Sequence, residues 1–147
     1  MMQLEGDREM PQSPAELWPK LSDARFLVQA VPEVESVAQS QADRAVCVIR
    51  PSLAFVRGTL ELTIEVVESV PDKSLRLLLH TKGIGSTSDV EANLTLTPQD
   101  GGTRVHWIAL VKNLGGLLKA VPQGLIKAAA QKVIADVWTA LEAQIVR

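Results

Sequence analysis

Few residues in this sequence could carry out acid–base or nucleophilic chemistry, and they are scattered along it. His80 and His106 are the two histidines, and Cys47 is the single cysteine. A cysteine nucleophile needs a histidine base close by, and a general base must be aimed at its substrate. Each histidine alternates with apolar neighbours in a strand-like pattern, so we expect both to face outward. We expect Cys47 to be a buried structural thiol.

Two carboxylates remain as acid–base candidates. Asp89 opens the alternating segment "DVEANL", and Asp136 lies beside the apolar stripe of the C-terminal segment. We expect both to be solvated or capping residues, because a carboxyl inside an apolar cavity has a raised pKa and costs stability when ionised. No spacing of histidine, cysteine or carboxylate residues matches a metal site, and no glycine-rich phosphate loop leads from a strand into a helix. The sequence therefore predicts no catalytic residue, no metal and no cofactor.

The middle of the chain must form the strands that position these residues. From residue 34 to residue 114 the apolar residues recur with a period of two, most clearly in "GTLELTIEVVESV". The segments "SLRLLLHTK", "DVEANLTLTP" and "RVHWIALVK" continue the pattern, and the turns "VPDKS" and "QDGGT" separate them. The pattern predicts antiparallel strands with one face in the core and the other in solvent.

Helical signals flank this run of strands. Residues 4–10 are a candidate first strand. Ser13 is then a candidate N-cap followed by Pro14 and Glu16, and residues 23–30 form a second short helical segment. After the strands, residues 114–146 indicate a long helix that Pro122 should kink or restart. Its apolar stripe, at spacings of three and four, is Leu118, Val121, Leu125, Ala129, Val133, Val137 and Leu141.

The overall composition is that of a globular domain. The chain has 147 residues, 46% hydrophobic and 22% charged, so we expect one domain over residues 1–147. A net charge of -2 gives no electrostatic footprint for nucleic acid or an anionic membrane. The single cysteine, and the lack of a signal peptide or of about 20 consecutive apolar residues, predict a soluble, cytoplasmic protein without a transmembrane segment. Helices before and after an antiparallel sheet define an α+β fold.

Several short motifs resemble one family in their order and spacing. They are "LWPKLSD" with Trp18, "VPEVES" with Pro32, "FVRGTLEL" with Gly58, "LTPQDGGTRV", and "GGLLKAVPQGLIKAAAQKVIADVW" with Gly115. Together they resemble the START and polyketide-cyclase (SRPBCC) superfamily, and most of all the carbon monoxide dehydrogenase CoxG family. The chain departs from that family before the first long strands, where Ala30 and Val34 stand in place of cysteines and Glu33 in place of a glycine.

The resemblance implies a helix-grip fold, in which a curved antiparallel sheet of about six or seven strands wraps around a long C-terminal helix. It also implies two short helices after the first strand, and an apolar cavity between the sheet and the last helix. Only 3% of the residues are aromatic, and the helix carries alanines at 128–130, which would leave part of that cavity unfilled. The candidate ligand-binding residues are Leu27, Leu62, Ile64, Leu77, Leu79, Val90, Ala92, Leu94, Trp107, Ala109, Leu118, Val121, Leu125, Ala129 and Val133.

One segment is apolar on both of its predicted faces. In "AVCVIRPSLAFVRG", alternation places Val46, Val48, Leu53 and Phe55 on the outer side of the sheet. Exposed apolar patches of this kind usually contact a partner, so we expect a homodimer or a protein partner at residues 46–55. Cover by the N-terminal segment, or a fold of Phe55 over the sheet edge, is the alternative.

Three functions are compatible with these observations. The first is non-catalytic binding or carrying of a hydrophobic small molecule such as a lipid, a quinone or a polyketide-like compound. The second, implied by the resemblance, is an accessory or assembly role for a molybdenum hydroxylase of the carbon monoxide dehydrogenase type. The third is an enzyme of the cyclase or dehydratase kind, which would need Asp89, His80 or His106 to point into the cavity.

Overall fold

A computed structural model describes residues 2–52 and 57–145 of the chain. Seven strands form one antiparallel sheet in the order β1-β7-β6-β5-β4-β3-β2. The strands are β1 (Met2–Met10), β2 (Val34–Ser40), β3 (Arg44–Ile49), β4 (Leu60–Val70), β5 (Ser74–Gly83), β6 (Ser86–Gln99) and β7 (Gly102–Gly116). The helices are α1 (Pro14–Leu21), α2 (Ala24–Gln29), the short 3-10 helix η1 (Leu117–Ala120) and α3 (Gln123–Ile145).

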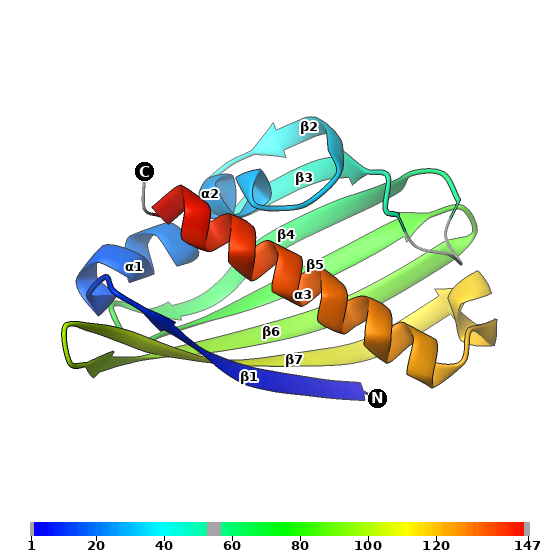
Figure 1. Ribbon diagram of the computed structural model, residues 1–147. Helices are drawn as coiled ribbons and strands as arrows, with labels where there is room; N and C mark the ends of the chain where they lie inside the picture. The colour runs from blue at the N-terminus through cyan, green and yellow to red at the C-terminus, as the bar shows by residue number, and fades with distance from the viewer. Residues whose placement is uncertain (1, 53–56, 146–147) are drawn as a thin grey trace.

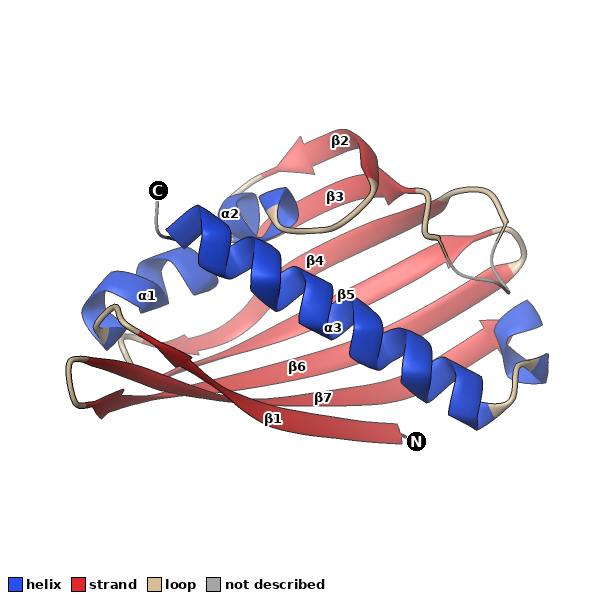
Figure 2. Ribbon diagram, viewed as in Figure 1, coloured by secondary structure: helices blue, strands red, loops and turns tan. Residues whose placement is uncertain are grey.

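The sheet is curved, and α3 runs diagonally across its concave face (Figures 1 and 2). Helices α1 and α2 lie at the end of the sheet that also holds the C-terminal end of α3. The opposite end holds the β5–β6 turn, η1 and the first turns of α3. This is the α+β layout that the alternating strands and flanking helices predicted, in the helix-grip form that the family resemblance implied, so the fold class is confirmed.

The two short helices begin where the capping signals placed them. The Ser13 hydroxyl accepts a hydrogen bond from the backbone N–H of Glu16 at 3.3 Å, and Pro14 is the first helical residue. The Glu16 carboxylate accepts from the Ser13 N–H in return, which completes a capping box. Helix α2 begins after Asp23, whose carboxylate accepts from the backbone N–H of Arg25 at 2.9 Å.

Strand register decides which side chains share the concave face. Ile64, Leu79, Val90 and Val111 are successive partners across β4, β5, β6 and β7, so all four point to the same side. The next residues along each strand point to the convex side. The concave face is therefore mainly apolar, as the period-two pattern predicted.

The last helix starts later than its apolar pattern indicated. Residues 114–116 end β7, and α3 begins only at Gln123, after η1 and Pro122. Gly116 has a φ of +62°, and a Cβ at this position would lie 1.7 Å from the carbonyl oxygen of Gly85. Only glycine fits where the chain leaves the sheet so close to the β5–β6 turn. Within the described ranges, no helix has the length and hydropathy needed to cross a membrane.

Candidate functional site

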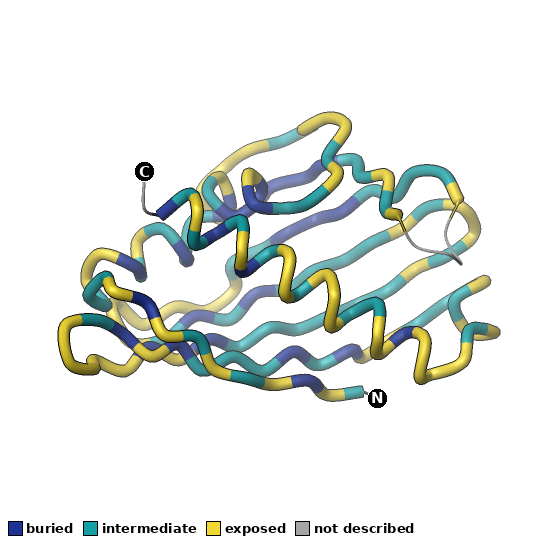
Figure 3. Tube along the Cα trace, viewed as in Figure 1, coloured by how far each residue is buried: buried dark blue, intermediate teal, exposed yellow. Residues whose placement is uncertain are grey.

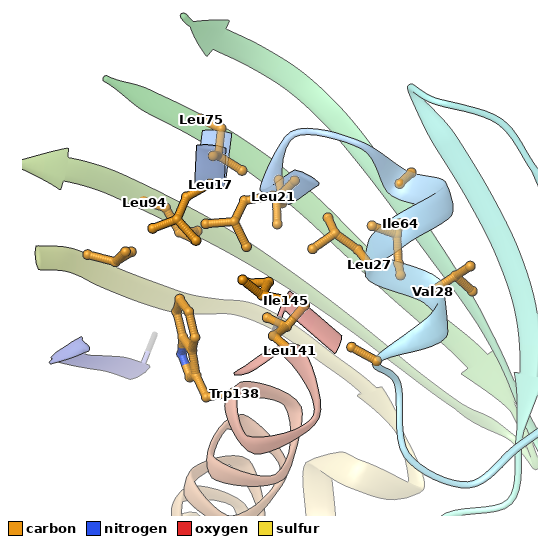
Figure 4. Close-up of a cluster of buried hydrophobic side chains, with 14 of the residues drawn as sticks. Leu17, Leu21, Leu27, Val28, Ile64, Leu75, Leu94, Trp138, Leu141 and Ile145 are labelled. Atoms are coloured by element: carbon orange, nitrogen blue, oxygen red, sulfur yellow. The ribbon is translucent and has the colours of Figure 1, made fainter. Parts of the chain in front are cut away.

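The space between the sheet and α3 divides into two halves, and one of them is filled. At the end that holds α1 and α2, side chains from both short helices, the sheet and the last turns of α3 point toward one another (Figure 4). Leu17 and Leu21 of α1 are fully buried, and Trp138 and Leu141 of α3 are 5% and 3% exposed. This filled half forms the hydrophobic core and leaves no room for a ligand.

In the other half, concave-face side chains remain partly exposed although α3 crosses above them. We call this region the open half and define it by five half-buried residues, Leu60, Leu79, Val90, Ala92 and Trp107. Leu79, Ala92 and Trp107 also pack against the edge of the core cluster, and Trp107 pairs with the buried Leu94. Figure 3 shows half-buried stretches of the central strands beneath α3. Inward-facing apolar residues of a sheet covered by a helix are normally buried. Their exposure shows that α3 does not close this part of the face.

Two clefts open to solvent lie at the margins of the sheet. The end cleft, of about 680 Å³, lies where β3 and β4 meet the β5–β6 turn, and its strand walls Val48, Glu61 and Lys82 face the convex side. The side groove, of about 430 Å³, lies between the edge strand β1 and the first half of α3. Both volumes are in the range of about 300–1,000 Å³ that is typical of small-molecule sites. Of these two clefts, the side groove is the one that adjoins the concave face, and it is open to solvent. The family resemblance implied an apolar cavity between the sheet and the last helix.

Trp107 contributes to the side groove from β7. Its register partner on β1 is Gly6, and a Cβ at Gly6 would lie 2.8 Å from Cζ2 of the indole. The missing side chain at position 6 lets the indole lie flat against β1. One face of this large ring can then contact a molecule in the groove.

The predicted ligand-binding residues are distributed over both halves. The filled half takes in Leu27, Leu62, Ile64, Leu77 and Leu94, each less than a tenth exposed. The open half takes in Leu79, Val90, Ala92 and Trp107. Ala109 belongs to a smaller buried cluster with Leu4 and Val111, and Leu118, Val121 and Ala129 are half-buried. The residues of the open half are therefore the ones that a ligand could reach.

Leu125 and Val133 differ from their predicted placement. They are 54% and 38% exposed, because α3 turns a neighbouring stripe toward the sheet. The buried residues of that stripe are Ile126, Trp138, Leu141 and Ile145, with Ile134 partly buried between them. Leu141 was also in the predicted stripe, so the predicted and observed faces overlap near the end of α3. They differ at its start, where two adjacent stripes are apolar and the docking angle of the helix decides between them.

The sequence reasoning missed several groups around the open half. Thr81 and Ser88 are register partners on the concave face, and their hydroxyls hydrogen-bond at 2.5 Å. Arg8 and Lys127 line the side groove from β1 and α3. Arg8 carried a detectable signal, because alternation along β1 places it on the same side as Leu4 and Met10. No local sequence pattern indicated that Lys127 would line the groove.

The acid–base candidates lie on the convex side of the sheet. His80 Nδ1 and the Asp89 carboxylate are 2.5 Å apart, and Asn113 donates to the other Asp89 oxygen at 3.2 Å. The hydrogen bond with His80, followed by that from Asn113, holds the pKa of Asp89 below its ordinary value. His106 likewise contacts Asp7 at 3.0 Å on the convex side. These side chains point away from the open half, as the alternation of the histidines predicted.

The remaining reactive groups are structural. Cys47 is fully buried, and desolvation raises the pKa of its thiol, which disfavours a thiolate nucleophile. Asp136 is exposed and pairs with Lys132 at 2.8 Å, one turn earlier on α3. Across residues 2–52 and 57–145, no three histidine, cysteine or acidic residues cluster closely enough to hold a metal ion.

The apolar outer patch is smaller than its pattern indicated. Val46 and Val48 do lie on the convex side, as register partners of Thr63 and Glu61. Val46 is only 8% exposed, however, and Val48 is half-buried at the end cleft. Leu53 and Phe55 lie outside the described residues. Within the described part of this patch, Val48 is therefore the residue that could contribute to a partner interface.

Comparison with known proteins agrees with this arrangement. Residues 6–146 match the carbon monoxide dehydrogenase CoxG family, so the chain belongs to that family. No curated protein sequence matches the chain.

Solved structures share the fold. A conserved protein from Geobacillus kaustophilus superimposes with a TM-score of 0.86 at 23% sequence identity, over 99% of this chain and 95% of that protein. A protein from Rhizobium loti gives a TM-score of 0.69 at 17% identity, over 97% and 95% of the two chains. One from Thermus thermophilus gives 0.65 at 17% identity, over 99% and 97%. At these identities the likeness concerns the helix-grip fold.

Proposed function

We propose that this protein binds a hydrophobic small molecule in the open half of its concave face without transforming it. The observation that carries the proposal is the partial exposure of Leu79, Val90 and Trp107 beneath a helix that should have buried them. A ligand in contact with these side chains would remove apolar surface from water, at a gain of about 25 cal/mol per Å². Membership of the CoxG family is compatible with a ligand-binding or an accessory role.

The experiment that tests this proposal introduces a larger side chain into the open half. Ala92 is a half-buried concave-face residue of β6, and Ala128 is an exposed residue of α3. We expect the purified protein to bind the neutral dye Nile red, and Ala92→Leu to weaken that binding at least tenfold because the added side chain occupies the ligand's space. Ala128→Leu is the matched control and should bind as the unmodified protein does. A protein that binds no dye, or an Ala92→Leu variant with unchanged affinity, contradicts the proposal.

The cyclase or dehydratase alternative loses the residues on which it depended. Such an enzyme needs an acid or base aimed at the bound substrate. Asp89, His80 and His106 all point to the convex side, so none of them can reach a molecule in the open half. The concave hydroxyls of Thr81 and Ser88 remain, and neither is a strong acid or base at neutral pH.

An accessory role for a molybdenum hydroxylase is the second candidate, and the family match favours it. Its direct test is analytical gel filtration of this protein mixed with a purified hydroxylase of the carbon monoxide dehydrogenase type. Co-elution that Val48→Asp abolishes would support a partner surface at β3. A homodimer through the same surface would instead appear as twice the monomer mass by light scattering, and the same variant should halve it.

A further inference from the structure

The two edges of the sheet differ in how well they could accept a further strand. β2 forms one edge, and two register shifts interrupt its pairing with β3 within seven residues. β1 forms the other edge, and all nine of its residues pair with β7 in unbroken register (Figure 1). Short, bulged edges discourage the addition of a strand, and long regular edges favour it. β1 is therefore the edge at which another strand could pair.

The outer backbone groups of β1 are free for such pairing. In an antiparallel ladder, the N–H and C=O groups of alternate residues point toward the neighbouring strand, and those of the residues between them point away. Across residues 2–52 and 57–145, the backbone of β1 forms its backbone hydrogen bonds with β7 and with no other segment. The side groove is lined by Gln3 and Glu5 from the convex side of β1 and by Leu4 from its concave side. A groove that both faces of one strand border runs along the edge of that strand.

The convex side of this edge is acidic. Glu5, Asp7 and Glu9 are successive convex residues of β1, and all three are exposed. Arg104 lies 3.8 Å from Glu9, and His106 contacts the other two carboxylates at 3.3 Å and 3.0 Å. Three carboxylates beside two basic groups leave the edge negative in either protonation state of the histidine. A second copy of β1 would place like charges opposite each other, whereas a strand with lysine or arginine at alternate positions would place opposite charges there.

The other side of an added strand would face the side groove. Leu4 and Ile134 give this part of the groove an apolar surface. Arg8, the charged concave residue of β1, already contacts Glu142 at 3.4 Å. Lys127 also lines the groove, so a basic side chain that pointed into it would meet a like charge. Apolar side chains therefore suit the positions between the basic ones.

We propose that the free edge of β1 binds an extended segment of a partner protein in which basic residues alternate with apolar ones. The segment adds to the sheet as an eighth strand next to β1, and it lies along the side groove. Backbone hydrogen bonds hold the segment, and the alternation of its side chains selects it. The acidic residues of β1 thus exclude a second copy of this chain and attract a strand of opposite charge.

The test compares three fluorescently labelled heptapeptides with blocked ends, whose binding is measured by fluorescence anisotropy at low salt. The first alternates lysine with valine, the second alternates glutamate with valine, and the third alternates lysine with proline. The proline peptide keeps the charge but lacks half of the backbone donors and favours a polyproline conformation. We expect the lysine–valine peptide to bind at least tenfold more tightly than either of the others. Rising salt should weaken its binding, because the carboxylates of β1 are exposed.

Variants and hydrogen exchange assign the binding to β1. Glu5→Lys combined with Asp7→Lys should reverse the preference, so that the glutamate–valine peptide binds more tightly than the lysine–valine peptide. Asp43→Lys combined with Glu68→Lys changes two exposed carboxylates outside β1, and this matched control should keep the original preference. Alternate backbone amides of β1 should exchange more slowly when the lysine–valine peptide is bound, because they then donate to its carbonyl groups. A circular dichroism melt of each variant checks that it is folded.

Three results would overturn the proposal. Equal binding of the lysine–valine and lysine–proline peptides would mean that charge alone attracts them and that no strand is added. An unchanged preference in the variant with lysines at positions 5 and 7, or unchanged exchange of the β1 amides, would place the binding elsewhere. A dimer mass by light scattering without peptide, together with slow exchange at alternate β1 amides, would mean that a second copy occupies the edge.

Discussion

Leu77 and Leu79 give a direct test of whether the concave face has a filled and an open half. They are successive inward-facing residues of β5, so they share a strand, a residue type and a side of the sheet. Leu77 is 7% exposed and packs in the core, whereas Leu79 is half-buried in the open half. Leu77→Ala and Leu79→Ala remove the same atoms from the two environments.

The expected costs follow from burial. A buried leucine truncated to alanine loses its transfer free energy and leaves a cavity, together about 3 kcal/mol. Leu79 already borders open space, so its truncation enlarges a solvent-filled cleft without creating a new cavity. Only part of the transfer free energy is lost there, about 1–1.5 kcal/mol. We therefore expect Leu77→Ala to be the more destabilising change by at least about 1 kcal/mol.

Urea denaturation followed by circular dichroism measures both costs. With a urea dependence of about 1.5 kcal/mol per molar, Leu77→Ala should lower the transition midpoint by about 2 M and Leu79→Ala by less than about 1 M. Nile red titration should give the opposite order, with a clear loss of affinity for Leu79→Ala and almost none for Leu77→Ala. Equal destabilisation by the two variants, together with equal dye affinities, would mean that the face is packed uniformly and would refute the division into halves.

Three further predictions test other parts of the structure. Leu141→Ala should lower the free energy of unfolding by about 3 kcal/mol, and Leu125→Ala should lower it by less than about 1 kcal/mol. The reason is that Leu141 is 3% exposed and Leu125 is 54% exposed on the same helix. Urea denaturation that gave the reverse order would refute the observed docking face of α3. Gly6→Ala should displace the indole of Trp107 and destabilise the protein by about 1–3 kcal/mol, which a shift in tryptophan emission and a urea titration would report, whereas an unchanged spectrum would contradict the close approach. Asp89→Asn should leave dye binding intact and cost less than about 1 kcal/mol at neutral pH, since the carboxylate is partly exposed. The pKa of Asp89 is lower in the folded protein than in the unfolded chain, so the ionised carboxylate stabilises the fold above the ordinary aspartate pKa. This stabilisation is lost as the pH falls through the pKa of Asp89 in the folded protein. The destabilisation caused by Asp89→Asn should therefore shrink in acid, and a destabilisation that grew in acid would contradict this reasoning.

The fold was predictable because its signals are local. The period-two alternation of residues 60–66, the cap at Ser13 and the turn at 99–102 each depend on neighbours a few positions away. The outward orientation of His80 and His106 followed from the same alternation. These features do not require knowledge of what the sheet packs against, so they could be read from the chain alone.

The side of α3 that faces the sheet was less accessible to sequence reasoning. The stripe through Leu125 and Val133 and the stripe through Ile126 and Ile134 are both apolar and lie next to each other on the helix. Only the angle at which α3 crosses the curved sheet selects the second stripe. The strand β7 continues to Gly116, and α3 begins only at Gln123, directly after Pro122.

The sequence by itself determined the α+β layout, the apolar face of the sheet and the outward position of the histidines, because residue alternation and capping act over short stretches of chain. The helix-grip form was implied by the resemblance of its motifs to a known family. The tertiary structure alone decided where space remains. Whether α1, α2 and α3 fill the concave face depends on segments more than 100 residues apart meeting in one buried cluster, which includes Leu17 and Leu21 of α1 and Leu141 of α3. The side groove likewise exists only because β1 pairs with β7 and lies beside the first half of α3, two segments that no sequence period connects.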